Sequence, residues 1–291
     1  MTYKFQTPAI FLIGPTASGK TETSLRLAEE FPLEIISVDS AMVFKEMNIG
    51  TCKPSLQNLE NVPHHLIDIL QPDAEFDVGI FIRYVDTAIQ TIIQNKKIPL
   101  FVGGTMMFHK VLFDGIHDFP RDDSLREEID QIRRNKGYQL LLNELELLDP
   151  ETFQLIDKKN PRRVQRALEI IKLTKTKLSL LKKEPSKKFL NSENCLILGM
   201  NDSKNNLDIS VEKRLRSIIE DGLVNELEKL INTYKLTSES HSMNSINYKQ
   251  FFPHMEGSLT LEDAFQDALS ATKKLICLLY TSPSPRDRTR S

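Results

Sequence analysis

Short apolar runs alternate with longer amphipathic stretches along the first hundred residues. Runs rich in branched and aromatic side chains occupy Ala9–Ile13, Glu34–Val38 and Ile98–Val102. The stretches between them, Lys20–Phe31 and Gly79–Asn95, have the spacing of helices. Because strands that alternate with helices form parallel sheets covered on both faces, this order predicts an α/β fold.

The pattern changes after residue 115. Residues 116–194 show helical periodicity, as in the leucine-rich stretch from Leu140 to Leu148, and lack clear strand-like runs. The apolar run Cys195–Gly199 is expected to rejoin the sheet, and an apolar stripe from Leu215 to Ile231 predicts helical packing on the core. We therefore predict a discontinuous core of residues 1–115 and 195–276, interrupted by a mostly helical insertion at 116–194.

Residues 277–291 differ from the rest of the chain in composition. From Tyr280 onward Pro, Ser, Thr and Arg dominate. Segments of this kind cannot bury enough apolar surface to fold, so we expect residues 277–291 to be disordered.

Composition disfavours several classes of protein. The chain has 291 residues, 40% of them hydrophobic, and a formal net charge of −2. No apolar run approaches the roughly 20 residues of a membrane span, and the start lacks a long apolar stretch, so we expect a cytoplasmic protein without a membrane partner. Cys52, Cys195 and Cys277 lie far apart, and the side chains of adjacent His64 and His65 point apart, so neither a zinc site nor a disulfide framework is expected.

Basic residues are concentrated in the predicted insertion. Residues 158–188 contain twelve lysines and arginines but only two acidic residues, whereas residues 121–157 contain five basic and ten acidic residues. A charge run of this kind is often only a solvated helix face. A polyanionic second substrate is the alternative explanation.

The segment after the first predicted strand matches the P-loop pattern of two glycines, a lysine and a threonine. The glycines let the backbone wrap an anion, the lysine adds a point charge, and the Thr21 hydroxyl suits Mg²⁺. A chance match in a turn is the alternative, which the preceding strand disfavours. We therefore predict a P-loop NTPase-like sheet that binds a di- or triphosphate. The predicted diphosphate-binding residues are Gly14, Pro15, Thr16, Ala17, Ser18, Gly19, Lys20 and Thr21.

Two further segments are predicted to lie at the same edge of the sheet. Asp39 and Ser40 follow the second strand, and Gly103–Thr105 follows the third. Ligands bind at this edge in open α/β folds. Asp39 could ligate Mg²⁺, act as a general base or cap a helix, whereas Thr105 could donate to a phosphate oxygen or belong to a plain tight turn.

Six segments along the chain form a recognisable set. They are Gly14–Thr21, Ile36–Ala41, Ile49–Pro54, Pro63–Asp68, Gly103–Met106 and Asn160–Glu169. Together these segments resemble the tRNA dimethylallyltransferases, also called tRNA isopentenyltransferases. They occur in the family's order and span nearly the whole chain, so the resemblance is more specific than a P-loop alone.

The resemblance implies transfer of a dimethylallyl group from its diphosphate to the exocyclic amine of the adenosine 3′ of the tRNA anticodon. On this basis we expect Asp39 to be the catalytic base and Thr105 to assist at the diphosphate, with Mg²⁺ as cofactor. The expected partners are dimethylallyl diphosphate and the anticodon stem-loop of tRNA, and the expected state is a monomer. The residues expected to bind tRNA are Asp39, Ser40, Ala41, Met42, Thr105, Arg126, Arg162, Arg163, Val164, Gln165, Arg166, Asn247, Tyr248 and Lys249.

Two segments depart from the family's pattern. Asn247-Tyr248-Lys249 stands where the family has Gly-Tyr-Arg or Gly-Tyr-Lys. Asparagine tolerates left-handed backbone, so we expect this turn to survive. The resemblance stops near Leu275, and from about Ile276 we expect foreign sequence from cloning or a sequencing adapter.

Three other functions fit part of the sequence. A P-loop nucleotide or metabolite kinase would share the core but would not explain the family-ordered segments. A relative that prenylates free adenine nucleotides would not need the basic insertion. A non-catalytic RNA-binding protein with a relic P-loop would not need Lys20, Thr21, Asp39 and Thr105 intact.

Overall fold

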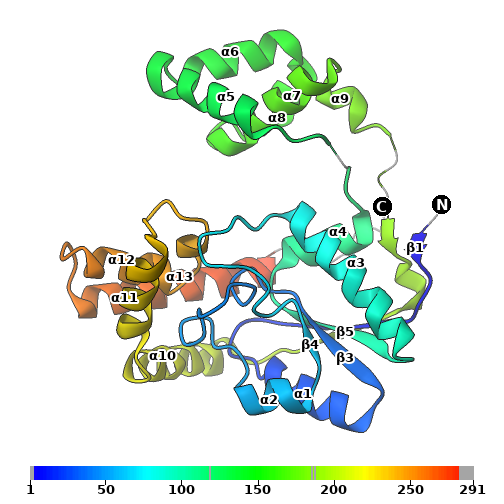
Figure 1. Ribbon diagram of the computed structural model, residues 1–291, viewed down its shortest axis with the longest axis vertical. Coiled ribbons are helices and arrows are strands. Elements are labelled where there is room, and N and C mark those ends of the chain that lie inside the picture. Colours follow the sequence, from blue (N-terminus) through cyan, green and yellow to red (C-terminus); the bar gives the residue numbers. More distant parts are fainter. Residues whose placement is uncertain (1–2, 118, 185, 187, 282–291) are drawn as a thin grey trace. The chain divides into compact units, whose positions relative to one another are not determined.

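The computed structural model describes residues 3–117, 119–184, 186 and 188–281 (Figure 1). The chain divides into two compact units. We call the unit built from Asp114–Lys188 the helical unit. We call the unit built from Tyr3–Phe113 and the chain from Phe189 onward the sheet unit.

A five-stranded parallel sheet forms the centre of the sheet unit. Its spatial order is β4-β3-β5-β2-β7, and every neighbouring pair is parallel. The three predicted strands and the predicted return of the fourth are confirmed, and with them the α/β fold class. The strands are β2 (Ala9–Ile13), β3 (Leu33–Ser37), β4 (His64–His65), β5 (Ile98–Gly103) and β7 (Cys195–Gly199).

Helices cover both faces of this sheet because side chains alternate along its strands. Phe11 of β2 stacks on Phe101 of β5 with ring centroids 4.6 Å apart, within the apolar cluster that includes α3 and α4. The neighbouring Leu12 belongs to the opposite cluster, against α1. The helix bounds are α1 (Lys20–Glu30), α3 (Val78–Gln94) and α4 (Met106–Asp114).

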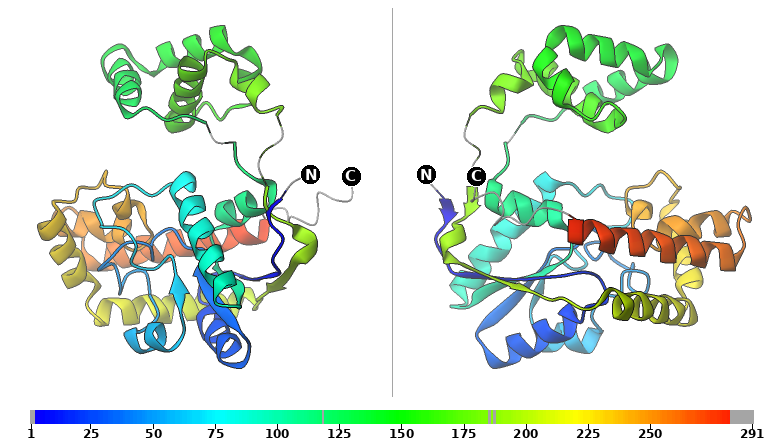
Figure 2. Two further views of the ribbon diagram at one scale, coloured as in Figure 1. Left: turned by 45° about the vertical axis from the view of Figure 1, so that its right-hand side comes forward. Right: turned by 180° about the vertical axis from the view of Figure 1, so that it is seen from behind.

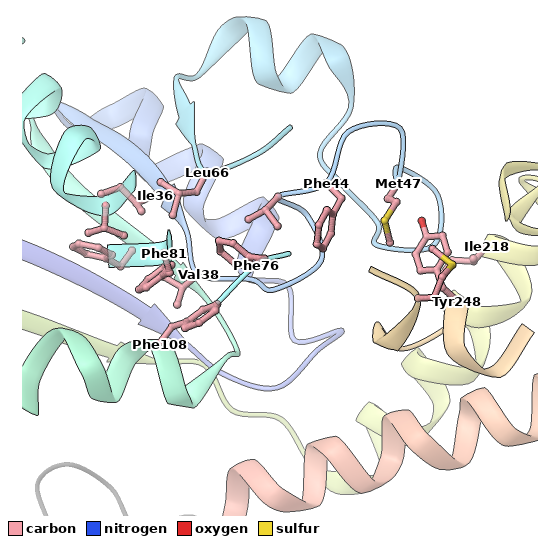
Figure 3. Close-up of a cluster of buried hydrophobic side chains, with 14 of the residues drawn as sticks. Ile36, Val38, Phe44, Met47, Leu66, Phe76, Phe81, Phe108, Ile218 and Tyr248 are labelled. Atoms are coloured by element: carbon pink, nitrogen blue, oxygen red, sulfur yellow. The ribbon is translucent and has the colours of Figure 1, made fainter. Parts of the chain in front are cut away.

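Four helices near the carboxyl end extend the same core. They lie side by side, coloured yellow to red in Figures 1 and 2. Figure 3 shows the core running from Val38 and Phe108 beside the sheet to Met47, Ile218 and Tyr248 beside these helices. The apolar stripe is confirmed as core, although it is divided between two helices at Gly222, whose φ is 103°. The helices are α10 (Lys204–Glu220), α11 (Leu223–Tyr234), α12 (Tyr248–Met255) and α13 (Leu261–Thr281).

Two predicted boundaries differ from the structure. A strand, β6 (Lys188–Leu190), pairs with β1 (Tyr3–Phe5), so the segment up to residue 194 is not free of strands and its last part belongs to the sheet unit. Helix α13 continues to Thr281 and buries Ile276 in the core, so residues 277–281 are helical where disorder was predicted. Residues 282–291 lie outside the described residues. The remaining short elements are α2 (Leu56–Asn61), η1 (Ser192–Asn194) and η2 (Ser242–Asn244).

The helical unit has its own apolar core. Leu141, Leu145 and Leu168 are completely buried in it. Three of its helices begin where a side-chain oxygen accepts from a backbone N–H, at Asp122, Asp149 and Asn160. No helix in the described part of the chain is long and apolar enough to cross a membrane. The helices are α5 (Asp123–Lys136), α6 (Tyr138–Leu148), α7 (Pro150–Leu155), α8 (Pro161–Thr174) and α9 (Leu178–Leu181).

A buried carboxylate joins α5 to α8. Glu169 is fully buried and accepts hydrogen bonds from Asp122 N, Arg126 Nε and Arg166 Nη1 at 2.8 to 2.9 Å. Burial alone would raise the pKa of this carboxyl, but these hydrogen bonds more than offset burial and hold the pKa below its usual value. We call Glu169, Arg126 and Arg166 the Glu169 cluster.

We predict that Glu169→Ala destabilises the helical unit by about 3 kcal/mol, because it leaves two partly buried guanidinium groups without their carboxylate. The free energy of unfolding, measured by urea titration, checks this. Glu151→Ala is the matched control, since the ion pair of Glu151 with Lys183 is exposed and such pairs contribute less than about 1 kcal/mol. Equal losses in the two variants would contradict the prediction.

Candidate active site

The carboxyl ends of three adjacent strands meet in the sheet unit. β5 lies between β2 and β3, so the P-loop after β2, Asp39 after β3 and Thr105 after β5 share one edge. The ends of β5 and β3 approach closely there: a Cβ atom on Gly103 would lie 2.2 Å from the Val38 carbonyl oxygen. Only glycine at this position lets the two strand ends pack side by side.

The P-loop wraps around its own lysine. Gly19 and Ala17 have φ of 82° and 62°, which turns the chain into the start of α1. Lys20 Nζ donates to Gly14 O at 2.9 Å and to Pro15 O. Thr21 is exposed on the first turn of α1. A helix start preceded by such a loop presents backbone N–H groups to an anion.

The charge of Lys20 depends on its surroundings. Burial, together with the nearby Arg214 guanidinium, lowers the pKa of Lys20 to about 8, while the Asp39 carboxylate acts in the opposite direction. Lys20 is therefore close enough to both Arg214 and Asp39 for their charges to act on it. A bound anion would favour the protonated form of Lys20.

Asp39 has one oxygen engaged in the backbone. Its Oδ1 accepts from Ala41 N at 2.7 Å and from Met42 N at 3.1 Å, which shapes the turn after β3. No helix begins at this turn, so the helix-cap alternative does not apply in its usual form. Within the described part of the chain no hydrogen bond to Oδ2 is found, which leaves that oxygen to accept a proton or ligate a metal.

Arg214 was missed by the sequence analysis. It projects from α10, and its Nη1 donates to Thr16 Oγ1 of the P-loop at 3.3 Å while its Nε donates to Cys52 Sγ at 2.9 Å. In the sequence Arg214 is one of several charged residues between apolar positions of a helix. Only the fold shows that this side chain faces the P-loop.

His109 is a second residue that the sequence did not single out. It is buried beneath the site, and its Nε2 lies 3.1 Å from the Gly103 carbonyl oxygen. Burial lowers the pKa of His109 to about 4, so the ring is neutral at pH 7 and donates from Nε2 to that oxygen. His109 thereby supports the turn that carries Thr105.

The structure of the segment Asn247-Tyr248-Lys249 fits its predicted role in tRNA binding only in part. The Tyr248 side chain is completely buried, so it is not available to tRNA, contrary to the expectation. Asn247, with φ of 76°, adopts the left-handed region, and its Nδ2 donates to Gly50 O at 2.7 Å. Lys249 is exposed. Of these three side chains, Lys249 is the most exposed.

The predicted RNA-binding residues of the helical unit fall into two groups: residues that are buried or have partners within the unit, and residues that are exposed. Val164 is completely buried, which excludes its side chain from the predicted contact. Gln165 Nε2 donates to Arg126 O, and the guanidinium of Arg166 donates to the carbonyls of Phe119 and Pro120. Arg126 and Arg166 belong to the Glu169 cluster, so both have structural partners.

The second group is Arg162 and Arg163, which are exposed at the start of α8. Arg163 Nη1 lies 3.6 Å from Asp157 Oδ2.

No cluster of three or more histidine, cysteine or acidic side chains that could hold a metal occurs among the described residues. His64 Nδ1 pairs with Val62 O at 2.7 Å, and His65 Nε2 pairs with Glu34 at 2.8 Å. These contacts explain the two adjacent histidines as structural. A metal ion that prefers oxygen ligands and takes most of them from a phosphate and water would need fewer protein side chains to bind it.

An open pocket of about 920 Å³ adjoins the P-loop through Arg214. Apolar side chains such as Ile49 and Ile218 line it together with Lys45, Lys53 and Arg214. Lys53 is not free to move in this pocket, because its Nζ donates to Asp68 Oδ1 at 2.6 Å and to Phe44 O at 2.5 Å. Arg214 is thus shared between the pocket wall and the P-loop.

Two family models match this sequence. The one described as IPP transferase covers residues 42–276, and the one described as isopentenyl transferase covers residues 8–74. The chain belongs to the IPP transferase family. Among curated IPP transferases, tRNA dimethylallyltransferase 2 of Geotalea uraniireducens is 39% identical over 259 residues, which are 88% of this chain and 83% of that protein. The tRNA dimethylallyltransferase of Thiobacillus denitrificans is 35% identical over 269 residues, or 92% and 86% of the two chains.

Solved structures of IPP transferases resemble this one. The tRNA delta(2)-isopentenylpyrophosphate transferase of Staphylococcus epidermidis has 30% identity and a TM-score of 0.64, covering 94% of this chain and 89% of that one. A eukaryotic dimethylallyltransferase, captured in crystallographic snapshots acting on tRNA, has 28% identity and a TM-score of 0.82, covering 94% and 69%.

We predict that inorganic diphosphate binds more weakly as the pH rises above about 8. Lys20 loses its proton in the free protein above its pKa of about 8, and the anion prefers the charged form, so affinity is retained below that pH and lost above it. Isothermal titration between pH 6.5 and 9.5 checks this. The fall attributable to Lys20 approaches tenfold per pH unit above the pKa.

Lys20→Met is the control for this titration. Diphosphate itself titrates in the same pH range, and the variant retains that contribution while lacking the lysine. The difference between the two proteins therefore isolates Lys20. Parallel pH profiles for the two proteins would contradict the assignment.

Proposed function

We propose that this protein transfers a dimethylallyl group from dimethylallyl diphosphate to the exocyclic amine of an adenosine in the tRNA anticodon loop. The observation that carries the proposal is the convergence of the P-loop, Asp39 and Thr105 at one sheet edge, in a chain that belongs to the IPP transferase family. Its curated relatives are named tRNA dimethylallyltransferases.

Diphosphate is the leaving group in this reaction. The bond between C1 of the allyl group and the diphosphate oxygen breaks while the adenine nitrogen bonds to C1, and negative charge grows on the diphosphate. P-loop N–H groups, Lys20 and Arg214 would meet that charge, with the Thr105 hydroxyl as a further donor. A site that favours charge developing in the transition state accelerates the reaction and does more than bind the donor.

Asp39 is proposed as the base. An adenine amine is a weak nucleophile, but its proton becomes acidic as the new carbon–nitrogen bond forms, so a carboxylate suffices to remove it. Two backbone N–H groups orient the carboxylate through Oδ1. Its Oδ2 would accept the proton from the amine.

The donors at this edge fit Mg²⁺. The Thr21 hydroxyl and the Asp39 carboxylate are hard oxygen ligands, and Mg²⁺ at phosphate sites takes one or two such side chains together with phosphate oxygens. When bound there, Mg²⁺ would neutralise part of the charge on the diphosphate. Thr21 and Asp39 would position dimethylallyl diphosphate whether or not both of them bind the metal.

The tRNA is proposed to meet the exposed basic residues. Specific RNA recognition favours loops whose bases can leave the stack, and a base must do so to reach a buried site. Arg162 and Arg163 are exposed at the start of α8, and Lys249 is exposed at the start of α12. Cations of this kind supply the salt-dependent part of nucleic-acid affinity.

Nucleoside mass analysis of unmodified tRNA incubated with the protein, Mg²⁺ and dimethylallyl diphosphate tests this function. We expect an isopentenyladenosine peak with the allylic donor and none when ATP replaces it. Asp39→Asn should lower kcat by about 10² to 10⁴, because it removes the proton acceptor while preserving the shape of the side chain. Glu220→Gln, an exposed acidic residue at the end of α10, is the control and should leave kcat unchanged.

Failure to form the product would remove the proposal. Phosphoryl transfer from ATP instead would identify a kinase. Binding of tRNA without any transfer would identify an RNA-binding protein that retains a P-loop. Full activity of Asp39→Asn would leave the transferase but reject Asp39 as its base.

We predict that Arg162→Ala and Arg163→Ala each reduce the salt dependence of tRNA binding. Each lost phosphate contact lowers the slope of log K against log salt by about 0.7 to 0.9. Arg166→Ala should instead lower the melting temperature, because Arg166 belongs to the Glu169 cluster. Filter binding between 50 and 300 mM salt checks the slopes.

The control for the salt series is Lys96→Gln. Lys96 precedes β5 and so lies at the opposite edge of the sheet from the strand ends that form the site. This variant should keep the slope of the unchanged protein. A smaller slope in Lys96→Gln as well as in Arg162→Ala and Arg163→Ala would show a general effect of charge and reject the two arginines as specific contacts.

A further inference from the structure

We propose that Glu226 is a positioning residue for the diphosphate site, and that it acts through the loop Asn48–Cys52 on Arg214. The inference rests on the proposed function only in taking the P-loop as a diphosphate site. Glu226 does not touch the P-loop in the structure. A continuous series of hydrogen bonds connects the two.

The first part of this series is the carboxylate itself. Glu226 Oε2 accepts from Asn48 N and Ile49 N, both at 2.8 Å, and Oε1 accepts from Gly50 N at 3.1 Å. Tyr248 adds its hydroxyl, which donates to Oε1 at 2.6 Å. One carboxylate thus collects three consecutive backbone N–H groups and a phenol, an arrangement stronger than four neutral hydrogen bonds.

The loop is shaped to fit this carboxylate. A Cβ atom on Gly50 would lie 2.6 Å from the Tyr248 ring, so the loop passes directly over the buried ring. Asn247 Nδ2 also donates to Gly50 O at 2.7 Å. Figure 3 shows Tyr248 beside Met47 and Ile218 in the core, so the support beneath the loop is itself packed.

The second part of the series reaches the P-loop. Cys52 N donates to Ile49 O at 3.0 Å, which closes a turn that places Cys52 in left-handed backbone with φ of 54°. Cys52 Sγ then accepts from Arg214 Nε at 2.9 Å, and Arg214 Nη1 donates to Thr16 Oγ1 at 3.3 Å. Arg214 is therefore held between this loop and the P-loop.

Holding Arg214 matters because a free arginine side chain has many rotamers. Ordering it costs entropy when an anion binds, and that cost is absent if the guanidinium is already placed. Glu226 fixes the loop, the loop fixes Cys52, and Cys52 fixes the guanidinium beside Thr16. Loss of Glu226 should thus weaken diphosphate binding although Glu226 never contacts the ligand.

A double-mutant cycle on diphosphate affinity tests this route. The probe is inorganic diphosphate with Mg²⁺, and the proteins are the full chain, Glu226→Gln, Arg214→Ala and the double variant. We expect each single variant to raise the dissociation constant about tenfold. We expect the double variant to bind no more weakly than Arg214→Ala, because the effect of Glu226 passes through Arg214. Affinity for tRNA should stay within about twofold throughout.

Glu46→Gln is the matched control. Glu46 also joins this region to α11, through Lys229 Nζ at 2.9 Å and the Tyr234 hydroxyl at 2.6 Å, but among the described residues no hydrogen bond links Glu46 to Arg214. Its diphosphate affinity should be unchanged. An equal loss in Glu46→Gln and Glu226→Gln would show that any contact between loop and helix suffices, which overturns the proposal.

Other outcomes are equally decisive. Unchanged affinity in Glu226→Gln, or losses that add in full in the double variant, would overturn the proposed route. If Glu226→Gln does not fold, Tyr248→Phe and Cys52→Ala replace it. Cys52→Ser is expected to restore the hydrogen-bond acceptor for Arg214. Normal diphosphate affinity in both Tyr248→Phe and Cys52→Ala would reject the route. No diphosphate binding by the unchanged protein would reject the proposed function itself, a result distinct from all of these.

Discussion

The placement of β5 between β2 and β3 is the constraint on which the site depends. In a parallel sheet the carboxyl ends of neighbouring strands lie at one edge, so the turns that follow them must share space. The P-loop, Asp39 and Thr105 come from three separate stretches of chain and meet only because of this order. The close approach of Gly103 to Val38 shows how little room the packing leaves. The chemistry of the site is thus a consequence of strand order.

Carboxylates that accept several hydrogen bonds stabilise loops by the same physical means in both units. Glu169 collects a backbone N–H and two guanidinium groups in the helical unit, and Glu226 collects three backbone N–H groups and a phenol in the sheet unit. A charged acceptor forms stronger hydrogen bonds than a carbonyl does, so one side chain can order a segment that lacks regular structure. Several charges that look like free surface charges in the sequence therefore have structural partners.

That distinction changes how the basic segment is understood. The sequence contains a dense run of lysines and arginines, and it suggests one polyanion-binding surface. Within this run the structure separates Arg166, which together with Arg126 balances a buried carboxylate, from Arg162 and Arg163, which are exposed. A positive charge that already has a buried partner contributes little to binding a further anion, because moving it would leave that partner unpaired.

The sequence by itself determined four strands of the five-stranded sheet, the P-loop and the family, because these depend on local periodicity and on residues adjacent in the chain. Local patterns predicted Ala9–Ile13, Glu34–Val38 and Ile98–Val102 to within a residue or so at each end. Only the tertiary structure decided that Arg214 faces Thr16, that His109 supports Gly103, that Tyr248 is core and that helix α13 continues past Ile276. Each of these depends on contacts between residues far apart in the chain or on packing around a helix, and such contacts leave no periodic signal in the sequence.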